Sequence, residues 1–305
     1  MSDGSRHSVA FIRESAFGIM PATPAFQNIR ATSCNLALSK NSSQSEELRQ
    51  DRQIAHFKHG SRSVAGDIGF ELSATTFDDF LESALGGTWA ADELKTGVSR
   101  RSYSIERYYG DIQAADKPWH RFTGCEINAF NLSVPTEGRV TGTFSFMGQD
   151  MSLGSALIAG AAYGAATTTN VIDSFTGTVK EGGQTNGVVT EITLALQNGL
   201  NAKPVVGSKT TLQHSIGRSN LTGQIAVYFE NATLLEKFIN ETASSLEFTL
   251  NDAAGNSYTF LIPKIIYTGA PLDVSGEGPI SLSLPFQALY DSTEGTNLKI
   301  TRVAA

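Results

Sequence analysis

The chain has 305 residues, 40% of them hydrophobic and 17% charged, which is typical of a globular protein long enough for two domains with buried cores. Its 30 acidic residues outnumber its 23 basic ones, and the resulting net charge of -7 argues against a surface built to grip nucleic acid. No stretch approaches the roughly 18 uninterrupted apolar residues of a membrane span, and the N-terminus lacks the apolar core of a signal peptide, so we expect cytoplasmic synthesis and no membrane contact.

The first half of the chain predicts strands around a single helix. Residues 1–30 have no sustained period and predict an extended N-terminal arm, either disordered or docked on a neighbour. A helix is predicted from about Thr76 to Leu85, where apolar residues recur at helical spacing before a Gly-Gly pair stops it. Strands are predicted over 34–40, 64–72, 103–109, 121–132 and 139–149.

A polar stretch over 41–61 separates the first two of these strands. It is rich in Ser, Gln, Glu and Arg, and residues 46–53 within it can form a short helix. Connections of this length inside a compact domain are usually functional or disordered. We therefore treat 41–61 as a long loop with a role outside the core.

The second half again predicts strands around one helical segment. Small and glycine-rich residues over 151–170 predict a linker, and the tail over 297–303 alternates as an edge strand or as a strand that adds to a neighbouring sheet. A turn over 251–256 predicts a hairpin. The expected strands lie near 173–180, 188–197, 222–230, 246–250, 257–267 and 280–289.

The second half repeats the first in the same order at low identity. The matched segments are 35–39 with 193–197, 66–72 with 223–229, 76–82 with 234–240, and 137–146 with 277–286. The offset falls from 157 (223 − 66) to 140 (277 − 137), which places an insertion of 17 residues in the first copy, near 89–118. This period is domain-sized, unlike those of solenoids and propellers. We predict one β-rich domain over 31–150 and a second over 171–305, which can supply two quasi-equivalent positions in a ring.

Motifs for chemistry are absent. The five histidines show no His-Glu-x-x-His pattern, and Gly207-Ser208-Lys209-Thr210 lacks the order of a phosphate-binding loop. Cys34 and Cys125 have no metal-ligand spacing and are interpreted as reduced residues of the core. We therefore expect no enzyme activity, no metal and no cofactor.

Several segments of the first third resemble the tail tube (major tail) proteins of siphoviruses, bacteriophages with long non-contractile tails. The segments are 14–18 with 21–26, 46–53, 63–72 and 77–89. The resemblance implies a mainly β fold with two duplicated tail-tube-type β-sandwich or half-barrel domains, each with one flanking helix. It also implies that six such domains close an inner β-barrel in a ring, and that stacked rings form the hollow tube through which the genome passes to the host. Closure of a barrel leaves no free sheet edge.

Most members of this family carry one tube domain per chain and form hexamers, whereas two copies per chain predict a homotrimeric ring with pseudo-sixfold symmetry. Three chains at -7 each carry -21 in total, a charge that lets DNA slide rather than adhere. The family implies a tape measure protein and tail terminator and tip proteins as partners, and only transient, non-specific passage of DNA. The implied location is the virion tail, assembled in the host cytoplasm.

Two groups of residues are candidates for these roles. Polar faces of strands are expected to line the lumen, with outer solvent as an equally open alternative, at Asp67, Glu71, Thr141, Thr143, Ser145, Ser281 and Ser283. Contacts between rings are expected from the arm 1–30, the C-terminal strand and the loop 41–61. In that loop, mixed charges suit complementary pairing with a neighbouring ring, at Glu46, Glu47, Arg49, Asp51, Arg52 and Lys58.

A second interpretation belongs to another class of protein. A β-sandwich that binds carbohydrate or another surface, as a tail-tip or fibre module, fits the same composition. It predicts a discrete aromatic patch and a monomer or a single ring, whereas a tube protein polymerises without a fixed end. An enzyme would need a His or carboxylate constellation assembled from residues remote in sequence.

Overall fold

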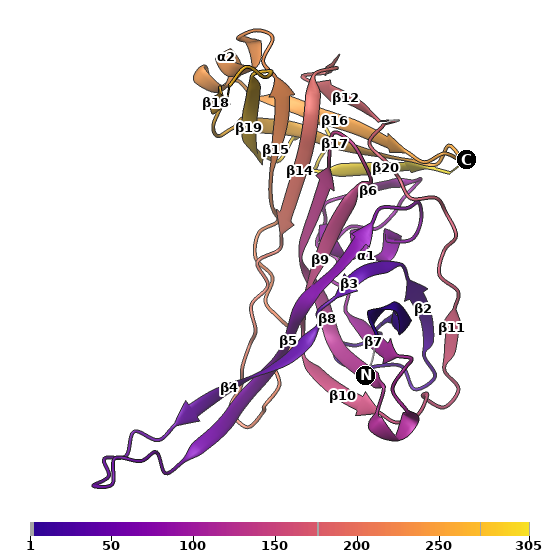
Figure 1. Ribbon diagram of the computed structural model, residues 1–305, viewed down its shortest axis with the longest axis vertical. Coiled ribbons are helices and arrows are strands. Elements are labelled where there is room, and N and C mark those ends of the chain that lie inside the picture. The colour runs from indigo at the N-terminus through magenta and orange to yellow at the C-terminus, as the bar shows by residue number, and fades with distance from the viewer. Residues whose placement is uncertain (1–2, 176, 275, 305) are drawn as a thin grey trace.

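A computed structural model describes residues 3–304 of the chain apart from 176 and 275. The fold is mainly β, as predicted, with two short α-helices. Figure 1 shows an elongated molecule in which the N-terminal half forms one end and the C-terminal half the other. Two 3-10 turns, η1 (Gly4–Arg6) and η2 (Ala114–Asp116), complete the helical content of the described residues.

Two sheets pack face to face in the first half. The long strand β8 (Trp119–Val134) belongs to both, because its first part pairs in the outer sheet and its last part in the inner one. The outer sheet adds β1 (His7–Arg13), β2 (Ala25–Ile29), β7 (Tyr103–Tyr109), β10 (Asp150–Gly154) and β11 (Ala162–Gly164). The inner sheet adds β3 (Ala31–Cys34), β4 (Ala37–Gln44), β5 (Phe57–Glu71) and β9 (Thr141–Gly148).

The second half has the same plan, with β17 (Ser257–Tyr267) as the strand shared by both sheets. Its outer strands are β12 (Thr178–Glu181), β13 (Gln184–Thr185), β16 (Ser244–Asn251) and β20 (Lys299–Val303). Its inner strands are β14 (Val189–Gln197), β15 (Asn220–Tyr228), β18 (Leu272–Asp273) and β19 (Ser281–Ala288). The small strand β6 (Glu93–Lys95) of the first half pairs with β20.

Strand pairing repeats along with the sequence. The outer order β1–β7–β8–β10 corresponds to β12–β16–β17–β20, and the inner order β4–β5–β9 to β14–β15–β19. Gly66 lies opposite Phe146 in the first half, as Gly223 lies opposite Phe286 in the second. The extra length of the first half falls in two places. In the first half, seventeen residues connect the helix to β7, and nine connect β7 to β8. In the second half, only four residues connect the helix to β16, and five connect β16 to β17.

Helix α1 (Asp78–Leu85) closes the core of the first half. Its acidic first turn suits the positive end of the helix dipole, and Gly86 adopts the left-handed conformation (φ 61°) that ends the helix. Phe80 is fully buried between rings of the outer sheet, Phe11 and Tyr103, and rings of the inner sheet, Phe144 and Phe146. Burying such a side chain stabilises a fold by about 1.5–3 kcal/mol. Helix α1 therefore holds the two sheets together.

Helix α2 (Thr233–Ile239) covers the second half more loosely. None of its residues is fully buried, although Leu234 and Phe238 pack against the core. Its firmest tie is ionic, because Lys237 Nζ lies 2.6 Å from a carboxylate oxygen of the buried Glu181.

The described part of the expected arm 1–30, from residue 3 onward, is not detached. Strand β1 pairs with β7 along its whole length, and β2 pairs with β1. Val9 and Phe11 are buried in the core, which explains why the segment stays with its own chain. The expected linker over 151–170 also begins in the outer sheet, where β10 pairs with β8, and β11 pairs in parallel with β2.

Two further expectations about segments are wrong. The stretch 41–61 is mostly a hairpin, since β4 runs to Gln44 and pairs there with Phe57 of β5, and residues 46–53 contain no helix. A helix of that length is marginal without an apolar face to bury. The C-terminal strand β20 is paired on both edges within the chain, by β17 and β6, so it adds no strand to a neighbouring sheet.

Candidate assembly surfaces

One inner sheet runs through both halves of the molecule. The end of β8 pairs antiparallel with β14, from Val134 opposite Ile192 to Ala129 opposite Gln197. This internal seam joins the two inner sheets into the continuous order β4–β5–β9–β8–β14–β15–β19–β18, which Figure 1 shows as a curved wall from the projecting hairpin to the far end. Residues that alternate along these strands face either the core or the opposite, concave side.

The lumen candidates fall on the side of this sheet that faces away from the core. Asp67 lies directly opposite Ser145, and Glu71 opposite Thr141, while the intervening Ile68 is buried in the core. Thr143 shares their face, and Ser281 and Ser283 occupy the corresponding face of β19 beside the buried Leu282 and Leu284. The sequence-predicted set is therefore assembled from three strands onto one side of one sheet.

A groove of about 740 Å³ runs over this face and crosses the internal seam. Its lining is dominated by small and hydroxyl-bearing residues of both halves, including Ser133, Thr143, Thr193 and Thr222. None of the described residues that line the groove is charged. Glu71 lies beyond this lining, and its carboxylate is paired with Arg139 at 2.7 Å. The centre of the concave face is thus neutral rather than acidic, and its described lining offers no cation to a phosphate.

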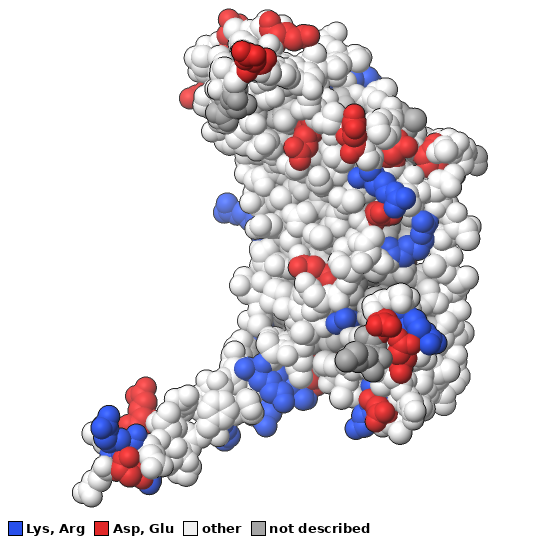
Figure 2. Space-filling model, in the orientation of Figure 1, with Lys and Arg blue, Asp and Glu red and all other residues white. Residues whose placement is uncertain are grey.

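The inter-ring candidates lie at the end of the hairpin formed by β4 and β5. Figure 2 shows this hairpin projecting from the body, with charges of both signs gathered at its tip. Arg49 and Asp51 form an ion pair at 2.7 Å, and the Arg49 guanidinium lowers the pKa of that carboxyl. Exposed charges occupy the connection and the start of β5, at Glu46, Glu47, Arg49, Asp51, Arg52 and Lys58.

Apolar side chains share this tip, and the sequence reasoning missed them. Leu48 is 100% exposed, and Ile54 and Phe57 are exposed by more than half. Exposed apolar side chains grouped on a projecting segment mark an interaction surface, since exposure gives a lone chain no stability.

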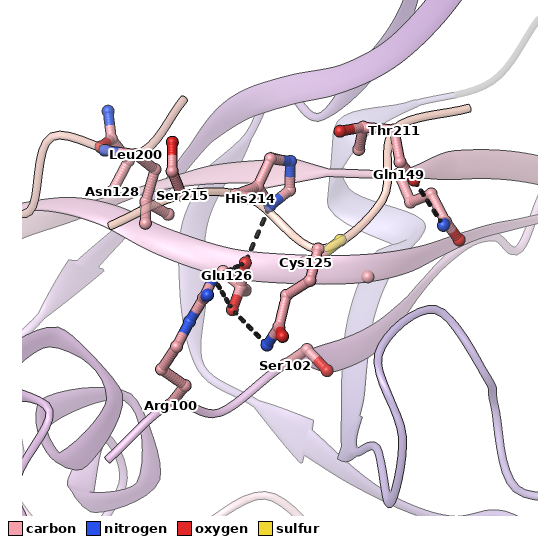
Figure 3. A network of polar contacts seen from close by, with 12 residues as sticks. Arg100, Ser102, Cys125, Glu126, Asn128, Gln149, Leu200, Thr211, His214 and Ser215 are labelled. Carbon is pink, nitrogen blue, oxygen red and sulfur yellow. Dashed lines mark hydrogen bonds and ion pairs between the residues drawn. The ribbon is translucent and has the colours of Figure 1, made fainter. Parts of the chain in front are cut away.

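The connection 198–219 occupies the same place in the second half as 41–61 in the first, yet it folds back. It lies along the first half and is bound there by a buried network of polar contacts, which Figure 3 shows closely. His214 Nδ1 lies 2.8 Å from Glu126 Oε2, and Arg100 Nη2 lies 2.7 Å from Glu126 Oε1. His214 is fully buried and Glu126 is 4% exposed. Glu126 therefore joins three segments of the chain.

Amide contacts extend this attachment. Asn198 Nδ2 donates hydrogen bonds to the carbonyls of Ala84 and Ile127, and the amide of Leu200 donates to Asn128 Oδ1. We call the connection 198–219 the brace, because it fastens the second half to the first beside the internal seam.

Buried carboxylates are the other feature that sequence reasoning missed. Glu14, in a segment that carries the family resemblance, accepts hydrogen bonds from Ser102, Ser104 and the amides of Gly18 and Gly124. It fixes the N-terminal segment against the outer sheet. Glu14 directly follows β1, and a single carboxylate there has no spacing signature, so its burial becomes evident only in three dimensions.

Other kinds of site find little support. No group of three or more His, Cys, Asp and Glu in the described part of the chain is arranged to hold a metal ion. None of the helices among the described residues is long and apolar enough to cross a membrane. Both cysteines are free thiols, and burial raises the pKa of each.

A curved sheet with a neutral concave face, two open edges and a projecting hairpin fits a structural protein. Comparison with known families agrees, because the family described as phage tail tube protein matches residues 4–288. The chain belongs to the phage tail tube protein family, and its role is structural. No curated protein matches the chain.

Proposed function

We propose that three copies of this chain form a ring in which six tube domains, two from each chain, close one inner β-barrel. The observation that carries the proposal is the continuous inner sheet, which already joins two tube domains through the internal seam. Among the described residues, β3 and β4 pair only with β5 at one end of this sheet, and β18 pairs only with β19 at the other. Open edges favour pairing with another chain, and ring closure satisfies both ends.

Rings then stack into a hollow tube in the virion tail, and the DNA genome passes through it. The lumen is assigned to the concave face that carries the seven candidate residues. The lack of charge in the groove supports free passage, because DNA is held chiefly by cations at its phosphates. The hairpin tip, with its exposed charges and Leu48, is assigned to contact with the adjacent ring. Tape measure, terminator and tip proteins are the expected partners within the tail.

Negative-stain electron microscopy of the purified protein tests this function. Striated hollow tubes, or separate rings, with threefold modulation of a sixfold outline in end-on views are the expected result. Native mass spectrometry of the rings should give three chains. A monomer under all assembly conditions would overturn the proposal, and rings of six chains would overturn its stoichiometry.

A further inference from the structure

The two open edges of the inner sheet are copies of the two strands that meet in the internal seam. The last part of strand β8, from Ile127, corresponds to the segment from Tyr267 through β18. The first of these segments pairs with β9 and the second with β19, at a constant offset in residue number. Ile127 lies opposite Phe146 as Tyr267 lies opposite Phe286, and Leu132 lies opposite Gly142 as Leu272 lies opposite Leu282. Strand β14 corresponds in the same way to residues 34–39.

Burial differs sharply between the seam and its copies. At the seam, Leu132 and Val134 are 2% and 8% exposed. Their equivalents at the open edge, Leu272 and Val274, are 39% and 67% exposed. On the other strand, Leu196 is 0% exposed at the seam, whereas the equivalent Leu38 is only half-buried. Both open edges therefore leave partly uncovered positions that strand pairing buries inside the chain, although Leu36 is already buried, as its equivalent Leu194 is at the seam.

Backbone direction at both edges is suitable for pairing. The Pro271 carbonyl accepts a hydrogen bond from the Ser283 amide, so the backbone of Pro271 points toward β19. The backbone N–H and C=O groups of the alternate residues 270, 272 and 274 therefore point outward, away from β19. The missing N–H of Pro271 thus removes no hydrogen-bond donor from the open edge. On the other strand, the Asn35 amide donates to the Asp67 carbonyl, so residues 34, 36 and 38 face outward.

We propose that residues 270–274 of one copy pair antiparallel with residues 34–38 of a second copy, in the register of the internal seam. Val274 then lies opposite Cys34, Leu272 opposite Leu36, and Ala270 opposite Leu38, as Val134 lies opposite Ile192 at the seam. The Leu36 carbonyl already accepts a hydrogen bond from Arg107 at 2.8 Å, and its second lone pair serves the partner strand. This inference rests on the proposed function, since it names the joint that closes the ring.

The natural Cys34 allows the register to be tested with one substitution. Val274→Cys places a thiol opposite Cys34 of the neighbouring copy, where directly paired strand residues have Cα atoms about 5.5 Å apart, within disulfide range. Val274 is 67% exposed in the single chain, so the change leaves the fold intact. Assembled tubes are oxidised with copper phenanthroline and analysed by non-reducing electrophoresis. We expect covalent species of two and three chains and none larger.

Matched variants define the alternatives. Leu272→Cys reports a two-residue shift of the pairing register, because only then does residue 272 lie opposite Cys34. A one-residue shift would place the two side chains on opposite faces of the sheet. Val274→Cys with Cys34→Ser should give no cross-link. An independent pair, Ala37→Cys with Pro271→Cys in the Cys34→Ser background, should cross-link again.

The possible failures are distinct. Tubes that form without a cross-link in both Val274→Cys and the Ala37 and Pro271 pair overturn the register and leave the tube function standing. A cross-link in Leu272→Cys tubes instead of Val274→Cys tubes also overturns it. Absence of rings and tubes from the unmodified protein overturns the proposed function itself.

Discussion

Replacing Glu126 by Ala should release the brace from the first half of the molecule. The Glu126 carboxylate accepts two hydrogen bonds from Arg100, at 2.7 and 2.8 Å, and faces His214 Nδ1 at 2.8 Å. His214 is fully buried, and among the described residues its Nε2 has no hydrogen-bond partner while its Nδ1 has Glu126, so Glu126 provides the ring's hydrogen bond. Alanine would leave both basic side chains without a counterpart in a buried site.

Removing one partner from a buried ionic contact costs about 3–5 kcal/mol. We expect Glu126→Ala to lower the local free energy of opening of residues 198–219 by that amount. Glu126→Gln keeps a carbonyl acceptor for one of the two partners but loses the charge, so about 2 kcal/mol is expected. Glu126→Ala should therefore lower this free energy more than Glu126→Gln, because only Gln retains an acceptor at the same site.

Native-state hydrogen exchange measures this opening segment by segment. Amides of the brace that bond to the first half, such as that of Leu200, should exchange faster in Glu126→Ala. Glu181→Ala is the matched control, since Glu181 is equally buried but binds Lys237 and Tyr267 within the second half. It should accelerate exchange there and spare the brace. Unchanged protection of the brace in Glu126→Ala would refute the assignment of this network as its anchor.

Replacing residues 45–56 with Asn-Gly, a turn that fits the paired strand ends, should give rings that no longer stack; long tubes in micrographs would contradict the inter-ring role. Ser145→Lys should make tubes retain DNA at low salt and release it at high salt, unlike the exposed outer-sheet control Ser152→Lys. Burial and Arg107 lower the pKa of His7 below 6.5, so the unfolded state binds more protons below that pH. The melting temperature should therefore fall as the pH drops below 6.5, and less steeply in His7→Gln.

Local patterns in the sequence were sufficient to predict most strands and both helices. The alternation of Phe144 and Phe146 with small polar residues predicted 139–149, and the structure has β9 over Thr141–Gly148. Strand β7 begins and ends where predicted, at Tyr103 and Tyr109. Alternation works here because one face of each strand meets a core and the other meets solvent or the concave groove.

Segments whose structure depends on distant partners escaped prediction. Strand β1 buries Val9, Ala10 and Phe11 in succession, so it lacks alternation, and its partner β7 is about a hundred residues away. The β4–β5 hairpin is exposed on both faces beyond residue 39, which removes the hydrophobic signal of a strand. The brace depends on Glu126 and His214, which are 88 residues apart in sequence.

The two copies differ most in the features that would distinguish two kinds of seam in a ring of three chains. Within a chain, the brace crosses beside the seam and is anchored at Glu126, and the seam strand carries the buried Phe130. Between chains, the equivalent position is Ala270, and the equivalent connection is the hairpin, which projects instead of folding back (Figure 1). An unbraced joint with a smaller side chain can form and dissociate while rings assemble, whereas the internal joint is fixed by folding. In the proposed ring of three chains, the same divergence would free three connections to reach the next ring. Duplication would thus divide two tasks, closing the ring and stacking it, between connections that began as equivalents.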